Sequence, residues 1–127
     1  IDTLTPPERP DSRKFIMYLP EGELHEMGLL FFTYMIRKEG HNVLYLGQST
    51  PFNGLQDLVE RWHPDFLVTG ALTSLPFGKP EDYLRRISTS FRDQTIFVGG
   101  VLAFHAGKIS LKNVVPFDSF NSLKQHL

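Results

Sequence analysis

The chain has 127 residues, of which 41% are hydrophobic, with no cysteine and a formal net charge of −1. This length predicts one domain with a single core, and the balanced charge argues against a nucleic-acid-binding surface in this chain. The lack of cysteine excludes disulfides, thiolate metal sites and thiol nucleophiles, and it is typical of a reducing compartment, so we expect a cytoplasmic protein. No apolar run approaches the roughly 18 residues of a membrane span, so we expect no membrane partner.

Residues 1–13 contain three prolines among polar residues and have little to bury, so we expect a linker there and one folded domain over residues 14–127. The start at Ile1 rather than Met also suggests a fragment of a longer protein.

The rest of the chain alternates short apolar runs with longer amphipathic segments. This pattern predicts strands over residues 15–19, 43–47, 66–70, 96–100 and 114–117. It predicts helices over residues 27–39, 51–62, 81–91 and from about 118 onward, whereas residues 101–110 fit either a short helix or a loop. Thr50 is expected to cap the second helix, with Pro51 at its first position.

Strands separated by helices of this length imply right-handed crossovers and a parallel sheet. We therefore predict an α/β, flavodoxin-like fold: a five-stranded parallel sheet of order 2-1-3-4-5 with helices on both faces. In such sheets, ligands bind beyond the carboxyl ends of the strands, so the residues that follow each strand are the candidate site.

Polar or small residues follow three of the predicted strands, at residues 21–28, 69–74 and 99–100. They match neither a P-loop, nor a dinucleotide-binding glycine motif, nor a zinc-protease helix. By residue type alone, Glu21, Glu23 and His25 form a possible site for a hard or borderline metal ion, although such clusters are more often solvated surface.

The spacing of these residues resembles a known signature. Residues 23–28, Glu-Leu-His-Glu-Met-Gly, resemble the Asp-x-His-x-x-Gly motif of cobalamin (vitamin B12)-binding domains, with Glu23 in place of Asp. The other matches are Thr69-Gly70-Ala71 for the family's Ser-x-Leu and Gly99-Gly100 for its Gly-Gly pair. The order and the gaps of residues 29–68 and 72–98 agree with the family as well.

The resemblance implies that His25 is the lower ligand of cobalt and replaces the cofactor's own base, whose nucleotide tail is then buried in the domain. Glu23 would orient the imidazole through its second ring nitrogen, with Glu26 as the alternative partner. Around the tail, Gly28 would give clearance at the first helix, Thr69 and Thr73 would offer hydroxyls, and Ala71 would leave a roomier wall. Gly99 and Gly100 would give backbone clearance near the nucleotide.

The stretch from Pro20 to Pro51 is most similar to the sensory domains of light-responsive MerR-type transcription regulators. This resemblance implies a non-enzymatic domain that binds adenosylcobalamin, or else methylcobalamin, and acts as a photoreceptor. DNA binding would belong to an upstream region, and the full-length protein would form a homo-oligomer. The alternatives are a corrinoid carrier module of a methyltransferase or mutase, and a degenerate domain that no longer binds cobalamin.

Overall fold

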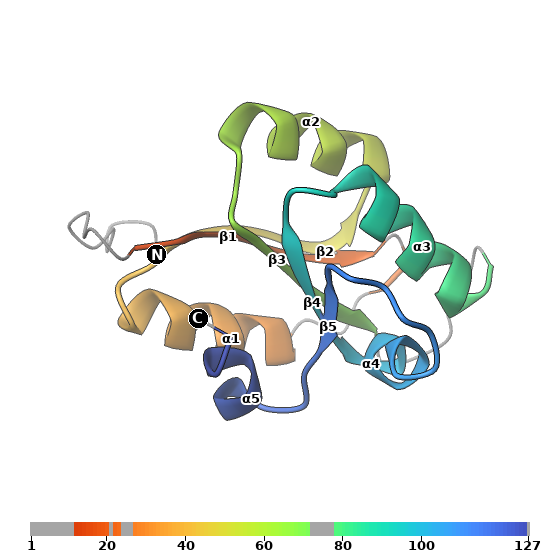
Figure 1. The fold of residues 1–127 in the computed structure, drawn as a ribbon. Helices are drawn as coiled ribbons and strands as arrows, with labels where there is room; N and C mark the ends of the chain where they lie inside the picture. Colours follow the sequence, from red (N-terminus) through yellow and green to blue (C-terminus); the bar gives the residue numbers. More distant parts are fainter. Residues whose placement is uncertain (1–11, 21, 24–26, 72–77, 127) are drawn as a thin grey trace.

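A computed structural model of the chain describes residues 12–20, 22–23, 27–71 and 78–126. Its strands are β1 (Lys14–Pro20), β2 (Asn42–Thr50), β3 (Phe66–Ala71), β4 (Thr95–Gly100) and β5 (Val114–Pro116). Its helices are α1 (Met27–Lys38), α2 (Phe52–Trp62), α3 (Pro80–Ser90), α4 (Val101–Ala106) and α5 (Phe120–Lys124). All neighbouring strands are parallel, in the order β2-β1-β3-β4-β5 (Figure 1), which confirms the predicted fold class.

Alternating side chains of the central strands supply two cores, one on each face of the sheet. Phe15 and Met17 of β1 pack on the face covered by α1 and α5, whereas Ile16 and Tyr18 pack on the face covered by α2 and α3. Because helices bury both faces, β1, β3 and β4 read as continuous apolar runs in the sequence.

The carboxyl ends of β1 and β3 separate, and this separation positions the site. Pairing between the two strands ends at Met17 and Val68, whereas β3 and β4 remain paired as far as Ala71 and Gly100. A space therefore opens beyond Val68, next to the start of α1.

One local prediction that left two alternatives open is resolved, and two others need revision. Residues 101–110, predicted as either a short helix or a loop, begin with helix α4, whose Leu102 is fully buried. Thr50 does not cap α2: it ends β2, and its hydroxyl donates to the Gly47 carbonyl, while Pro51 is the N-cap without a side-chain bond. The last helix begins at Phe120 rather than near 118, because Ser119 caps it and accepts a hydrogen bond from the Ser122 amide.

Of the expected linker, residues 1–11 lie outside the described part of the chain. Ser12 and Arg13 are tied to the loop after α1, since the Ser12 hydroxyl donates to the Gly40 carbonyl and the Arg13 amide donates to Nδ1 of His41, both at 3.0 Å. Among the described residues, no helix has the length and apolar character that crossing a membrane requires.

Candidate functional site

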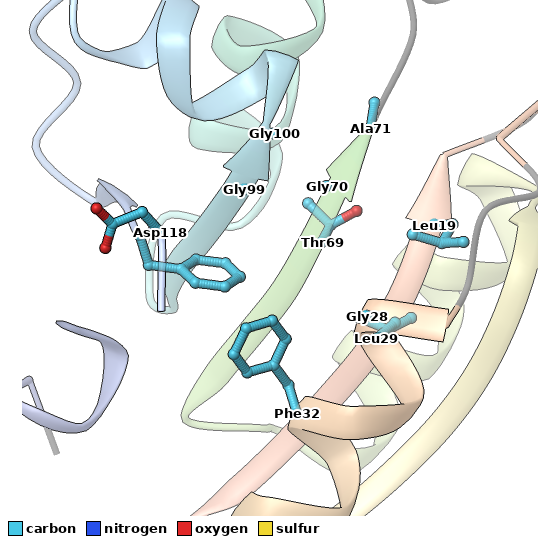
Figure 2. Close-up of a pocket in the computed structure, with 11 residues that line it drawn as sticks. Leu19, Gly28, Leu29, Phe32, Thr69, Gly70, Ala71, Gly99, Gly100 and Asp118 are labelled. Carbon is cyan, nitrogen blue, oxygen red and sulfur yellow. The ribbon is translucent and has the colours of Figure 1, made fainter. Parts of the chain in front are cut away.

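A pocket of about 180 Å³ lies at the carboxyl edge of the sheet, where β1 and β3 separate (Figure 2). Its walls come from the ends of β1, β3 and β4, the first turns of α1 and the segment between β5 and α5. The described residues that line it are Leu19, Gly28, Leu29, Phe32, Thr69, Gly70, Ala71, Gly99, Gly100, Phe117 and Asp118.

Five of the eight residues expected at the site line this one pocket: Gly28, Thr69, Ala71, Gly99 and Gly100. They come from three separate segments of the chain, and the parallel sheet brings these segments to the same edge. The remaining three are placed differently. Glu23 is buried before α1 with 4% of its surface exposed, and it is not among the described lining residues, whereas His25 and Thr73 lie outside the described residues.

The backbone of Glu23 is fixed on both sides. Its amide donates to the Pro20 carbonyl and its carbonyl accepts from the Ser49 amide, each at 3.0 Å. The amide of Gly22 donates to the Ser49 hydroxyl at 3.1 Å. Gly22 and Glu23, the described residues between β1 and α1, are therefore attached to the ends of β1 and β2.

The motif glycines serve different purposes. Among the described residues, no atom outside its own helix and chain neighbours lies within 4 Å of a Cβ built on Gly28, which lines the pocket. A Cβ on Gly99 would lie 3.1 Å from the ring of Phe117. Gly100 has a φ of +63°, and its Cβ would overlap the Ala71 carbonyl oxygen. Gly100 is therefore required by the fold itself, and Gly99 leaves little room for a side chain beside Phe117, whereas packing within the described structure does not explain Gly28.

Thr69 carries the buried hydroxyl of the pocket. The residue is 1% exposed, and among the described residues its Oγ1 has no hydrogen-bond partner of acceptable geometry. In Figure 2 this oxygen is turned toward the β1 side, where Leu19 lies. A buried hydroxyl without a partner is costly, and because this oxygen has almost no exposed surface, a ligand in the pocket could pair with it only after the Thr69 side chain rotates.

The neighbouring hydroxyls belong to two tyrosines. Tyr83 donates to the Tyr18 hydroxyl at 3.0 Å. Burial raises the pKa of Tyr18 to about 12, and the hydroxyls of Tyr83 and Thr69 oppose that rise. Tyr18 is therefore neutral at physiological pH, and neither tyrosine is among the described lining residues of the pocket.

Sequence reasoning missed the aromatic wall of the pocket. The rings of Phe32 and Phe117 meet edge to face, with centroids 5.1 Å apart and planes at 89°. Phe32 lies one helical turn after Gly28, so it shares a helix face with a motif residue. Phe117 directly follows β5, and extending the search of strand ends to the fifth strand would have identified it.

No three His, Cys, Asp or Glu side chains of the described residues gather closely enough to hold a metal ion. The metal site considered from residue type includes Glu21 and His25, which lie outside the described residues. Asp118 is the one charged residue among the described lining residues, and Figure 2 shows its carboxylate directed away from Gly70 and Phe32. The described pocket is thus shaped for an apolar, uncharged group.

No family model and no curated protein matches the chain. Among solved structures, it resembles a novel cobalamin-binding protein from Desulfitobacterium hafniense DCB-2, with a TM-score of 0.73 and 18% identity over 91% of this chain and 58% of that one. It also resembles the methanol:cobalamin methyltransferase complex MtaBC from Methanosarcina barkeri, with a TM-score of 0.72 and 17% identity over 94% of this chain and 46% of that one. A two-component response regulator of the LuxR family from Aurantimonas sp. SI85-9A1 gives a TM-score of 0.58 and 18% identity, over 90% and 81% of the two chains.

The chain spans about half the length of the two cobalamin proteins. Its fold is the α/β fold found in these cobalamin-binding proteins, and it matches them better than it matches the response regulator. The resemblance seen in the sequence is therefore confirmed at the level of the fold.

The described lining of the pocket is compatible with an apolar part of a cofactor. The space beside Gly28 is open, the walls are apolar, and the Thr69 hydroxyl lacks a partner within the described structure. The open space and the apolar walls can accommodate a flat aromatic group.

Proposed function

We propose that this chain is a cobalamin-binding domain that takes up the cofactor base-off, with the imidazole of His25 as the lower ligand of cobalt. One observation carries the proposal: motif residues from three segments, Gly28, Thr69 with Ala71, and Gly99 with Gly100, line a single apolar pocket. The fold shared with cobalamin-binding proteins supports it independently.

Bound cobalamin would supply a cobalt atom with an exchangeable upper ligand, and the chain would supply ligation, burial and orientation. A neutral imidazole is a good nitrogen donor, and a carboxylate on its other ring nitrogen fixes the tautomer. We assign that orienting role to Glu23, whose side chain is buried and whose backbone is held between β1 and β2. Thr69 would donate its hydroxyl proton to the free nitrogen of the displaced base.

The test is titration of the purified chain with hydroxocobalamin, followed by visible absorbance. We expect the spectrum of a base-off, histidine-ligated corrinoid, and we expect His25→Ala to lose it. His63→Asn is the matched control, because His63 is exposed with a φ of +52°, a conformation that Asn tolerates. Labelling histidine with ¹⁵N and recording the electron paramagnetic resonance of the cobalt(II) form gives a direct readout. An unchanged nitrogen hyperfine pattern would contradict ligation by histidine.

For the biological setting, we propose that the domain is the sensory part of a MerR-type transcription regulator, with DNA binding supplied by an upstream region. The support is the resemblance of residues 20–51 to those regulators. A corrinoid module of a methyltransferase is the second candidate, favoured by the likeness to the methanol:cobalamin methyltransferase complex. A helix-turn-helix encoded upstream would support the regulator, and a methyltransferase partner would support the carrier.

We further propose that the full-length protein self-associates and that light changes this state. The outer face of α1 supports a protein contact, because four side chains at helical spacing are exposed on it: Met27, Leu30, Phe31 and Tyr34. Light scattering on the adenosylcobalamin-loaded full-length protein, in the dark and after illumination, tests this. An unchanged mass and unchanged DNA affinity would contradict photoreception and leave cobalamin binding intact.

A further inference from the structure

Two helices of the chain begin with the same Phe-Asn pair but differ in their caps. Residues 51–54 read Pro-Phe-Asn-Gly, and Pro51 is the N-cap of α2. Residues 119–122 read Ser-Phe-Asn-Ser, and Ser119 is the N-cap of α5. Asn53 and Asn121 therefore occupy the same position in the first helical turn, and both are exposed. The chain thus offers two asparagines that can be compared directly.

The backbone amide that follows the asparagine is paired in α5 and unpaired in α2. In α5, the Ser122 amide donates to the Ser119 hydroxyl at 3.2 Å. In α2, Pro51 makes no side-chain cap bond, because its ring carries no acceptor. The Leu55 amide donates to the Pro51 carbonyl at 3.2 Å, but within the described structure nothing accepts from the Gly54 amide.

Gly54 is also sterically open. Among the described residues, no atom outside its own helix and chain neighbours lies within 4 Å of a Cβ built on it. A glycine lets another group approach its backbone nitrogen closely, since it has no side chain of its own. The side chain of Asn53 is exposed beside it. The side-chain amide of Asn113, by contrast, is held by three carbonyls at the end of α3, those of Ser88, Phe91 and Gln94.

We propose that Asn53 is a site of spontaneous deamidation in the folded protein. The Gly54 backbone nitrogen gives its proton to solvent base and attacks Cγ of Asn53, the bond from Cγ to the side-chain nitrogen breaks, and ammonia leaves. The succinimide so formed adds one water molecule, and opening of either of its two carbonyl–nitrogen bonds gives aspartate or isoaspartate. Nothing is oxidised or reduced. No cofactor takes part, so the proposal goes beyond the proposed function and does not depend on it.

The two products affect α2 differently. Aspartate adds a negative charge to a first turn that otherwise has none, a position that the helix dipole favours. Isoaspartate places an extra methylene in the main chain, which disturbs the turn between Pro51 and Leu55. Phe52 lies in that turn, is buried, and has the guanidinium of Arg86 3.7 Å from its ring centroid. Isoaspartate therefore weakens the packing of α2, whereas aspartate preserves it.

The test incubates the purified chain, without cofactor, in mildly alkaline buffer made with ¹⁸O-enriched water. Peptides are then separated and identified by mass spectrometry, which reports the conversion at Asn53 and at Asn121 in the same sample. Gly54→Ala adds a side chain next to the reacting nitrogen, and Pro51→Ser adds an N-cap hydroxyl that can accept from the Gly54 amide. Circular dichroism before incubation confirms that each variant is folded.

We expect the product at Asn53 to contain ¹⁸O and to form about tenfold faster than the product at Asn121, and Gly54→Ala to remove most of this difference. Pro51→Ser should slow the reaction severalfold in the folded chain. In urea, Pro51→Ser and the wild-type chain should react at the same rate, because the cap exists only in the folded helix.

An intact Asn53, or conversion no faster than at Asn121, would overturn the proposal. Equal rates in the folded wild-type chain and folded Pro51→Ser would also overturn it, because the unpaired Gly54 amide would then not be the cause.

Discussion

Gly100 meets the backbone of Ala71 so closely that no side chain fits between the two residues. They are Cα partners at the ends of β4 and β3, and a Cβ on Gly100 would overlap the carbonyl oxygen of Ala71. The chain turns directly from β4 into α4 at this point, with a φ of +63° at Gly100. The close approach of β3 and β4 at the edge that carries the site therefore requires glycine at position 100, because any side chain there would clash with the Ala71 backbone.

Gly100→Ala is expected to lower the free energy of unfolding by about 3 kcal/mol, because it combines a strained backbone conformation with a backbone clash. Urea unfolding followed by circular dichroism measures this. Gly54→Ala is the control: Gly54 lies in α2 with no atom within 4 Å of its added Cβ, so it should gain about 0.5 to 1 kcal/mol. Small and equal changes in the free energy of unfolding for Gly100→Ala and Gly54→Ala would contradict a clash at Gly100.

Thr69→Val tests the buried hydroxyl. Removing an unpaired buried polar group while keeping its shape should raise the free energy of unfolding by about 1 kcal/mol, and it should weaken cobalamin binding because a donor to the base is lost. Thr69→Ser keeps the hydroxyl and should retain binding. A loss of stability in Thr69→Val would mean that the hydroxyl is paired with the neighbouring Tyr18 hydroxyl, whose pKa it lowers.

Because Tyr18 is buried, we expect the free energy of unfolding to fall at alkaline pH. Burial raises its pKa from 10.0 to about 12, so the unfolded chain loses this proton at lower pH than the folded chain does. The stabilising contribution is complete below pH 10 and is lost as the pH rises toward 12, by roughly 2 to 3 kcal/mol in total. Urea unfolding at a series of alkaline pH values should show this decline, and Tyr18→Phe should reduce it. If the free energy of unfolding declined as much in Tyr18→Phe, groups other than Tyr18 would be responsible for the decline.

The sheet order was predictable because β1, β3 and β4 are short apolar runs separated by helices, and parallel connections leave few topologies. The convergence of Gly28, Thr69 and Gly99 follows from the same rule. Local sequence patterns gave the wrong assignment where strand pairing sets the end of an element. Thr50-Pro51 fits the start of a helix, yet Thr50 pairs with Pro20 of β1 and extends β2. Phe32 and Phe117 meet because α1 and the segment after β5 pack on the same face of the sheet, a contact that no local pattern contains.

Glu81 of α3 pairs with His105 of α4, and the effect of this pairing on the Glu81 pKa can be measured by NMR. The pKa of the Glu81 carboxyl lies below its usual value, mainly because a backbone amide donates a hydrogen bond to it. His105, whose Nδ1 lies 3.1 Å from Oε2 of Glu81, and the charge of Lys108 lower this pKa further. Such a carboxyl contributes stability above its unfolded-state pKa and loses it as the pH falls through the folded-state pKa. In His105→Gln, the Glu81 pKa should rise while remaining below the usual value, since the backbone contribution stays. An unchanged carboxyl titration would mean that the ion pair is not formed in solution.

Gly28 provides a variant that separates binding from folding. It is the second residue of α1 and lines the pocket, and no described atom hinders an added Cβ there. Gly54 is equally unhindered in α2 and lies outside the described lining. Because helical glycines cost about 0.5 to 1 kcal/mol relative to alanine, replacing either one should preserve or increase stability.

Gly28→Leu should nevertheless reduce cobalamin affinity at least tenfold, because its side chain would occupy space that the nucleotide tail needs, and Gly28→Ala should have a smaller effect in the same direction. Gly54→Leu should bind cobalamin like the wild-type chain. Urea unfolding and absorbance titration of the same samples separate the two properties. Wild-type affinity in a folded Gly28→Leu variant would show that the tail is not bound in this pocket, and a matching loss in Gly54→Leu would show that the effect is not specific to the site.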